Sequence, residues 1–284
     1  PALRQAILKR LALADQNLTA FTVFKRAYDA RKTSAIQLNS TIDAEVKDEA
    51  SVLKRLEKDK QIGRTPDISY RQVTTAPAST KRPVVVGMGP CGLFAGLILA
   101  EMGFNPIILE RGKIVRERTV DTFKFWRKAI LDPSSNAQFG EGGAGTFSDG
   151  KLYSQIKDPR HLGRKVLTEF VEAGAPDEIL FVSKPHIGTF RLVSMIEHMR
   201  EKIERLGGEI RFKQQVTDIL LHDRNGEKQI AGVVLANGDA IETDHVVMAL
   251  GHSARDTFEM LHGRGVFFEP KPFSIGVRLE HPQS

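Results

Sequence analysis

The chain has 284 residues, of which 41% are hydrophobic and 27% are charged, a composition typical of a globular protein with room for about two domains. Its single cysteine excludes an intrachain disulfide, and its first residues lack the apolar run of a signal peptide, so we expect a cytoplasmic protein without a membrane partner. The net charge of +6 comes from residues 1–82, which hold 16 Lys and Arg against 9 Asp and Glu.

Residues 1–75 are predicted to form a small basic α+β domain. The pattern of apolar residues favours strands at 6–13 and 34–46 and helices at 21–31 and 49–59. Small and polar residues at 76–82 have the composition of a linker. The positive charge indicates either a surface for RNA or an ordinary solvated face, and we favour the solvated face because no aromatic platform accompanies the charge.

A glycine-rich turn follows a short strand at 84–86. Gly87 permits the tight turn, Gly89 leaves room for a pyrophosphate, and Gly92 lets the next helix approach the strand closely. Pro90 starts that helix, where a missing N–H group costs nothing. Because the free N–H groups of the first helical turn face the phosphates, the pattern predicts a unit that binds the ADP part of a dinucleotide.

A second apolar run, at 106–109, ends on Glu110. At this position a carboxylate can accept hydrogen bonds from ribose hydroxyls, and its charge disfavours the 2′-phosphate of NADP. We expect this dinucleotide domain to span residues 83–284. The strand, the turn and Glu110 do not by themselves distinguish FAD from NAD.

A second glycine cluster lies at 138–151. Its glycines give the backbone the freedom to bring N–H groups close to a flat ring or a phosphate. Thr146, Ser148 and Asp149 add small polar groups beside Phe147. A flexible surface loop is the alternative interpretation.

The remaining segments are predicted to alternate between helices and strands. A charged helix reaches residue 130, and helices at 161–173 and 190–206 lie in a helical insertion, 152–208, on the substrate side. Strands follow at 209–212, 216–222, 230–235 and 245–249, with turns at 223–226 and 236–239. The fold class is therefore α/β, with a three-layer Rossmann-like domain and a mostly parallel sheet after the small α+β domain.

The strand at 245–249 returns the chain to the nucleotide and is followed by Gly251. Val216, at the start of an earlier strand, is a candidate contact for adenine. Together with the second glycine cluster, these positions favour FAD over NAD.

Five segments carry a resemblance to a known family: VGMGPCGLFAG at 86–96, QFGEGGAGTFSDGKL at 138–152, KPHIGT at 184–189, GHSARDT at 251–257 and KPFSIGVR at 271–278. Through them the chain resembles an uncharacterised group of FAD-dependent dehydrogenases in the glutathione-reductase-type FAD/NAD(P)-binding superfamily. The resemblance covers nearly the whole chain. It implies that FAD is held by Gly87, Gly89, Gly92 and Glu110, with Val216 and Gly251 on the adenosine side. The other residues that we expect at the cofactor are Pro90, Cys91, Arg111, Gly142, Gly143, Thr146, Phe147, Ser148 and Ala249.

Members of this superfamily usually close the FAD site with a glycine-rich segment near the C-terminus. No such segment follows Gly251. We therefore expect the chain to be truncated at its C-terminus and to lack residues of the substrate side.

The residues also limit the chemistry. A disulfide-reductase mechanism is excluded because no cysteine pair is present, and no metal-ligand spacing appears. Without a second dinucleotide motif, we expect the substrate to reduce the flavin directly, by hydride transfer to N5. His186 is the first candidate for a base, although a histidine that only holds its loop is the simpler interpretation. His252 is expected to be structural or near the cofactor.

Three functions remain open from the sequence. An FAD-dependent oxidoreductase of the dehydrogenase type, acting on a small molecule, is favoured. The basic domain makes a flavin-dependent RNA-modifying enzyme an alternative, in which nucleic acid would be a partner whose binding weakens with salt. A non-catalytic FAD-binding scaffold is the third. The sequence assigns neither catalytic residues nor an oligomeric state.

Overall fold

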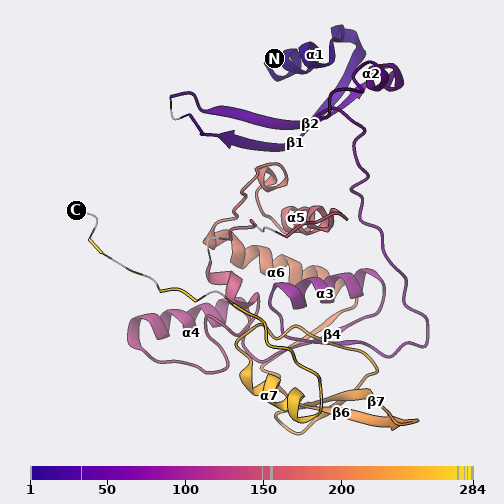
Figure 1. The fold of residues 1–284 in the computed structure, drawn as a ribbon. Helices are drawn as coiled ribbons and strands as arrows, with labels where there is room; N and C mark the ends of the chain where they lie inside the picture. The colour runs from indigo at the N-terminus through magenta and orange to yellow at the C-terminus, as the bar shows by residue number, and fades with distance from the viewer. Residues whose placement is uncertain are drawn as a thin grey trace.

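The computed structural model describes residues 2–32, 34–148, 150–153, 156–273, 275–277, 279 and 281–282. Within these residues the chain has a mixed α/β fold, and its strands form three sheets. One is a two-stranded ribbon, one is a four-stranded parallel sheet, and one is a three-stranded antiparallel sheet (Figure 1).

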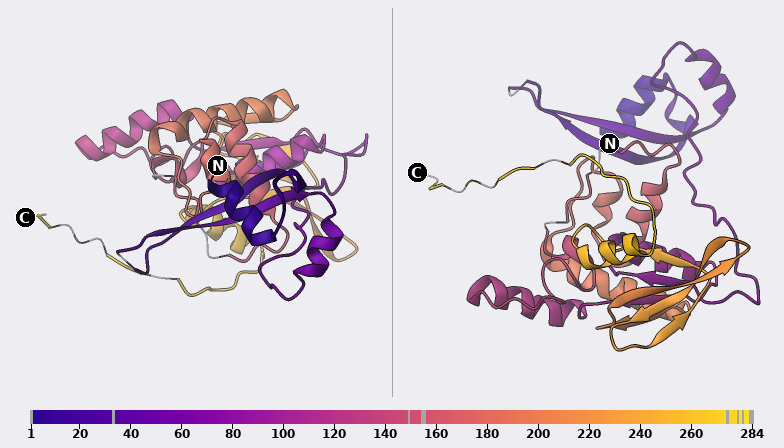
Figure 2. Two further views of the ribbon diagram at one scale, coloured as in Figure 1. Left: turned by 90° about the horizontal axis from the view of Figure 1, so that it is seen from above. Right: turned by 60° about the horizontal axis from the view of Figure 1, so that its bottom comes forward.

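The first part of the chain builds the ribbon and two helices. Helix α1 (Ala2–Leu11) and the short turn η1 (Asp15–Asn17) come first. Strands β1 (Leu18–Asp29) and β2 (Gln37–Val46) then pair in antiparallel fashion and are followed by α2 (Glu49–Arg55). Figure 2 shows this part beside the remainder of the chain, to which a long extended segment connects it.

Two predictions in this part were wrong. Residues 6–13 were predicted as a strand but lie largely in α1, because Leu3, Ile7 and Leu11 recur with the four-residue spacing of a helix. Residues 21–31 were predicted as a helix but lie largely in β1, where β-branched and aromatic residues favour a pleated strand. The second strand and the second helix are confirmed as β2 and α2, each shorter than predicted.

The parallel sheet has the strand order β5-β4-β3-β9. Its members are β3 (Val84–Val86), β4 (Ile107–Glu110), β5 (Glu209–Phe212) and β9 (Val246–Met248). Helix α3 (Pro90–Glu101) connects β3 to its parallel neighbour β4. Because β4 lies on one side of β3 and β9 on the other, the strand order reverses at β3.

The remaining elements surround this sheet. Between β4 and β5 the chain forms α4 (Val115–Lys128), η2 (Gly143–Phe147), α5 (Leu162–Glu172), η3 (Asp177–Leu180) and α6 (Thr189–Arg205). The antiparallel sheet contains β6 (Val216–Arg224), β7 (Glu227–Leu235) and β8 (Ala240–Glu242), and α7 (Arg255–Gly263) follows β9. The predicted turns at 223–226 and 236–239 join β6 to β7 and β7 to β8.

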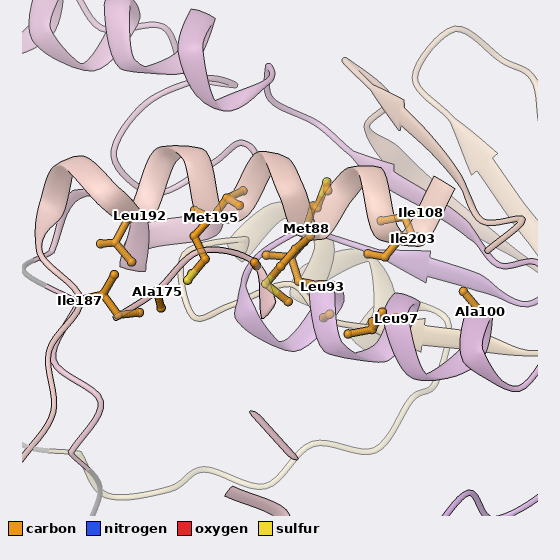
Figure 3. Packing of buried hydrophobic residues seen from close by; sticks show 14 of the residues in the cluster. Met88, Leu93, Leu97, Ala100, Ile108, Ala175, Ile187, Leu192, Met195 and Ile203 are labelled. Carbon is orange, nitrogen blue, oxygen red and sulfur yellow. The ribbon is translucent and has the colours of Figure 1, made fainter. Parts of the chain in front are cut away.

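The hydrophobic core lies where α6 packs over α3 and the sheet (Figure 3). Met199 and Ile203 of α6 are buried with Leu97 of α3 and Ile108 of β4. A side chain at Gly96 of α3 would overlap Ile108, so glycine allows this close approach. Residues 152–208, predicted as an insertion, thus contain a helix of the core, α6. The domain boundaries themselves stay a prediction.

An ion-pair cluster links α3, α5 and α6. Glu169 is only 3% exposed and accepts hydrogen bonds from Lys165 and from Lys202, each at 2.6 Å. Lys165 also donates to Glu101 of α3 at 2.8 Å. Burial raises the pKa of Glu169, but the two ammonium groups lower it more, so its pKa lies below the ordinary value of 4.5.

Glu169→Gln should lower the free energy of unfolding at pH 7, because the ionised carboxylate stabilises the fold above its ordinary pKa. The deficit relative to the wild type should shrink as the pH falls below 4.5, since the wild-type carboxylate then becomes protonated too. Urea unfolding at pH 7, 5 and 3.5 measures this. Glu172→Gln, at a half-exposed partner of Lys202, is the matched control and should cost less. A deficit that grows toward acid pH would contradict the role of Glu169.

Candidate functional site

A cavity of about 310 Å³ opens at the carboxyl ends of β3, β4 and β9. Its wall comes mainly from residues 86–91, 109–111, 138–140, 143–145 and 249–254. Parallel sheets bind ligands at the position where the strand order reverses, and the cavity lies at that position. The fold therefore places the glycine-rich turn, the end of β4 and the second glycine cluster around one space.

The turn after β3 depends on two glycines. Gly87 has a φ of 99°, and a Cβ there would lie 2.5 Å from the carbonyl oxygen of Ala249. At Gly92 a Cβ would overlap the carbonyl oxygen of Gly87. Glycine is thus required at position 87 by its positive φ and the neighbouring chain after β9, and at position 92 by the close approach of α3 to the turn, as the sequence predicted for Gly92.

Gly89 is different, because the protein itself leaves room for a Cβ at this position. Its φ of −73° is accessible to any residue, and the nearest atom to a Cβ would be the Cα of Gly143 at 3.7 Å. The N–H groups of Cys91 and Gly92 belong to the first turn of α3, which lacks intrahelical partners. Gly89 and Gly143 lie next to each other in the cavity wall, and Gly89 and the first turn of α3 form a cradle at the positive end of a helix.

Glu110 is buried and accepts three backbone hydrogen bonds. Its Oε2 accepts from the N–H of Met88 at 2.8 Å, and its Oε1 accepts from the N–H groups of Gly112 at 2.8 Å and Gly140 at 3.0 Å. A carboxylate offers about four acceptor positions, so about one remains for a ligand. The sequence predicted a ribose contact here, and the structure adds a bracing role that connects the turn, β4 and the glycine cluster.

Arg118 lies completely buried under the second glycine cluster. It donates to the carbonyl oxygens of Asn136 and Glu141 at 2.8 and 2.6 Å and to Oγ1 of Thr146 at 3.1 Å. Its guanidinium group lies 4.8 Å from the centre of the Phe147 ring. Burial lowers the pKa of Arg118 to about 10, so the group stays charged at neutral pH. Thr146 and Phe147 thus contact Arg118.

Glu141 is the second buried charge under the cluster. Both of its carboxylate oxygens accept from Arg200 of α6 at 3.0 Å, and one accepts from the N–H of Val115 at 2.6 Å. Burial raises the pKa of Glu141 to about 7, and the Val115 N–H and Arg200 oppose that rise. The cluster is therefore fixed to the start of α4 and to α6 by polar contacts.

The cavity brings together most of the predicted cofactor residues. Those in its wall are Gly87, Gly89, Pro90, Cys91, Glu110, Arg111, Gly143, Val216, Ala249 and Gly251. Those outside the wall are Gly92, Gly142, Thr146, Phe147 and Ser148. Asp149 lies outside the described residues. Of the cofactor residues predicted within the glycine cluster, Gly143 lies in the wall and most of the others do not.

Several residues of the wall were missed by sequence reasoning. They include Gln138, Phe139, Gly140, Ala144, Gly145, Gln214, Ser253, Ala254 and Thr257. Seven of them lie in two glycine-marked segments, 138–145 and 251–254, so the segments could be found, although the individual side chains could not. His252, expected to be structural or near the cofactor, is in the wall.

Two side-chain bridges connect the segments around the cavity. Arg111 donates to Asp256 at 3.1 Å and to Thr257 at 3.0 Å, and its guanidinium lies 4.5 Å from the centre of the Phe139 ring. Ser253 donates to Gln138 at 2.9 Å. These bridges join the end of β4 and the glycine cluster to the start of α7.

His186 does not belong to the cavity wall. It is exposed and pairs with Lys151 in an isolated β-bridge, and the N–H of Ile187 donates to the carbonyl oxygen of Gly150 at 3.1 Å. This favours the loop-holding interpretation over a base. Within the part of the chain that the structure describes, no group of three or more His, Cys, Asp or Glu could hold a metal ion. No described helix has the length and apolar character that crossing a bilayer requires.

Comparison with known proteins adds to this geometry. The family model described as "Flavin containing amine oxidoreductase" matches residues 129–267, slightly under half of the chain. An uncharacterised protein of Clostridium beijerinckii is 42% identical over 288 residues, which is 99% of this chain and 51% of the relative. The chain therefore spans about half the length of the curated relative that it matches.

Solved structures are similar at lower identity. THI4 of Thermovibrio ammonificans is 20% identical, with a TM-score of 0.44 over 66% of this chain and 62% of that chain. The GidA-related protein of Thermus thermophilus is 14% identical, with a TM-score of 0.34 over 61% of this chain and 54% of that chain. The family match, which includes much of the cavity wall, supports FAD as the cofactor.

Gly89→Ala tests the cradle. Because the backbone and the neighbouring atoms accept a Cβ here, the melting temperature should stay within about 2 °C of the wild type, while the methyl group occupies the space that a phosphate needs. We expect FAD affinity to fall tenfold or more, measured by titration of flavin fluorescence. Gly263→Ala, in open space in α7, is the control and should leave the affinity unchanged. Unchanged affinity in Gly89→Ala would place the phosphates elsewhere.

Glu110→Gln tests whether this carboxylate holds the three backbone segments together. The amide nitrogen cannot accept a hydrogen bond, so at least one buried N–H group loses its partner, at a cost of about 1–3 kcal/mol. Urea unfolding of the protein without FAD should show this loss. Glu227→Gln, at an exposed position in β7, is the control. Equal stability of both variants would show that the carboxylate does not brace the site.

Proposed function

We propose that this chain forms the FAD-binding part of a flavin-dependent oxidoreductase. The observation that carries the proposal is the cavity at the start of α3, which has the cradle at Gly89 and the buried carboxylate of Glu110 in its wall. The family match supports both the cofactor and the general class of reaction.

The residues of the cavity fit the parts of FAD in a definite order. The N-terminus of α3 and the cradle at Gly89 would hold the pyrophosphate. The remaining acceptor position of Glu110 would take a ribose hydroxyl, and Val216 and Gly251 would lie on the adenosine side. The backbone of 143–145 would approach the flavin side of the molecule.

When bound, FAD would supply the redox chemistry by accepting a hydride from the substrate at N5, as in a dehydrogenase. The protein would bind and orient the cofactor through backbone N–H groups and would exclude water with the apolar wall of Met88, Leu109 and Leu250. Amines are the first substrate class to test, because the matching family is described by amine oxidation. The relative of about twice the length supports the view that the whole protein contributes more of the substrate side.

The decisive experiment compares FAD with its parts. Because the proposed site takes the ADP part, purified protein should bind FAD at least a hundredfold more tightly than FMN, and ADP should compete with FAD. Binding is measured by flavin fluorescence and by isothermal titration. If FMN binds as tightly as FAD, or if ADP does not compete, the proposed orientation is wrong.

A further inference from the structure

A second concave surface lies in the first part of the chain, apart from the FAD cavity. It is a groove of about 760 Å³ between β2, α1, α2 and residues 61–65. Ile7 of α1 and Val52 of α2, both buried, lie in its wall, and Leu38 of β2 is 59% exposed at its side. The groove therefore has apolar side chains beside polar ones in its wall and is open to solvent.

The groove follows an edge of the ribbon. Residues 38–42 of β2 all contribute to its wall, as do Ala44 and Val46. Successive side chains of a strand point to opposite faces. Because every residue from 38 to 42 contributes to the wall, the groove lies along the edge of the strand there and not over one of its faces. From residue 38 to residue 42 this edge is about 13 Å long at the usual rise per residue, and Ala44 and Val46 continue the wall on the same face as Ile42.

The two edges of the ribbon differ in what covers them. The edge of β1 is partly paired, because the N–H of Arg26 donates to Phe181 at 2.7 Å and the N–H of Ser183 donates to Arg26 at 2.9 Å. Within the described residues, β2 pairs with β1 and with no third strand. An open edge presents a row of N–H and C=O groups to any extended chain, and an isolated two-stranded ribbon is only marginally stable in water.

The groove also has a charge preference at one end. Helices α1 and α2 each have two basic residues in the last turn, and the guanidinium of Arg55 donates to the carbonyl oxygen of Leu11 at 2.7 Å, which brings the two helix ends together. Arg10 in the wall is paired with Asp59 at 2.6 Å. Lys9, Lys54 and Arg55 lie next to this end, outside the wall, and outnumber Glu49, the acidic residue of the wall, so this end complements acidic side chains on an occupant.

We propose that the groove receives an extended polypeptide segment, which adds to β2 as a third strand. Alternate apolar side chains of this segment would enter the space lined by Ile7 and Val52, and acidic residues would follow at the basic end of the groove. Backbone hydrogen bonds to β2 would supply affinity, and the apolar wall would supply selectivity. The groove is thus an interaction surface for an extended, acidic-ended peptide, independent of FAD binding.

A designed peptide tests strand addition directly. The probe is a nine-residue peptide of alternating valine and threonine that ends in two glutamates, titrated into the full chain by calorimetry. Two N-methylated versions carry the methyl groups on odd or on even residues, so each blocks one edge of the peptide. One version should bind like the parent, and the other should bind at least tenfold more weakly. Amide exchange of β2 should slow when the parent peptide is bound.

Protein variants locate the site. Leu38→Glu places a charge in the exposed side of the groove and should weaken peptide binding at least tenfold. Tyr28→Glu is the matched control, because Tyr28 is 72% exposed and pairs with Leu38 across the ribbon but lies outside the groove wall. It should bind the peptide like the wild type. Both variants should bind FAD normally.

Three outcomes would overturn the proposal. Equal binding of both N-methylated peptides would mean that the groove takes apolar groups without strand pairing. Equal loss in Tyr28→Glu and Leu38→Glu would place binding on the ribbon face. If the peptide does not bind, the edge does not accept such a peptide, whether light scattering finds the chain monomeric or dimeric.

Discussion

The carboxylate of Glu110 is the contact on which the candidate site depends. Three backbone segments meet there, and each contributes an N–H group: the turn after β3, the chain after β4 and the second glycine cluster. Buried N–H groups need acceptors, and a single carboxylate satisfies three at once. The cavity exists because these segments stay in place around it.

The second glycine cluster has its own support. Arg118 and Glu141 are fully buried, but each is surrounded by hydrogen-bond partners, which offset part of the cost of removing a charge from water. The shape of the cluster is therefore fixed by polar contacts inside the protein. A site that is formed before its ligand arrives binds that ligand with a smaller loss of conformational entropy.

The two parts of the chain differ in how complete they are as folded units. The parallel sheet is covered by α3 and α6, and the core between them is closely packed (Figure 3). The ribbon has one open edge and an apolar groove beside it. The first part thus presents a surface for a partner strand, while the second presents a cavity for a cofactor. The positive charge of residues 1–82 belongs to the part with the groove.

The sequence by itself determined the elements whose conformation depends on residues that are neighbours in the chain. Gly87, Gly92 and the short strand before them predict a strand, turn and helix, and the strands at 84–86 and 209–212 were predicted residue for residue. It failed at α1 and β1, where short apolar runs fit both periods. Only the tertiary structure decided that Glu110 braces three segments, that Thr146 contacts a buried arginine and that α6 belongs to the core. These depend on contacts between residues far apart in the chain, which no local pattern contains.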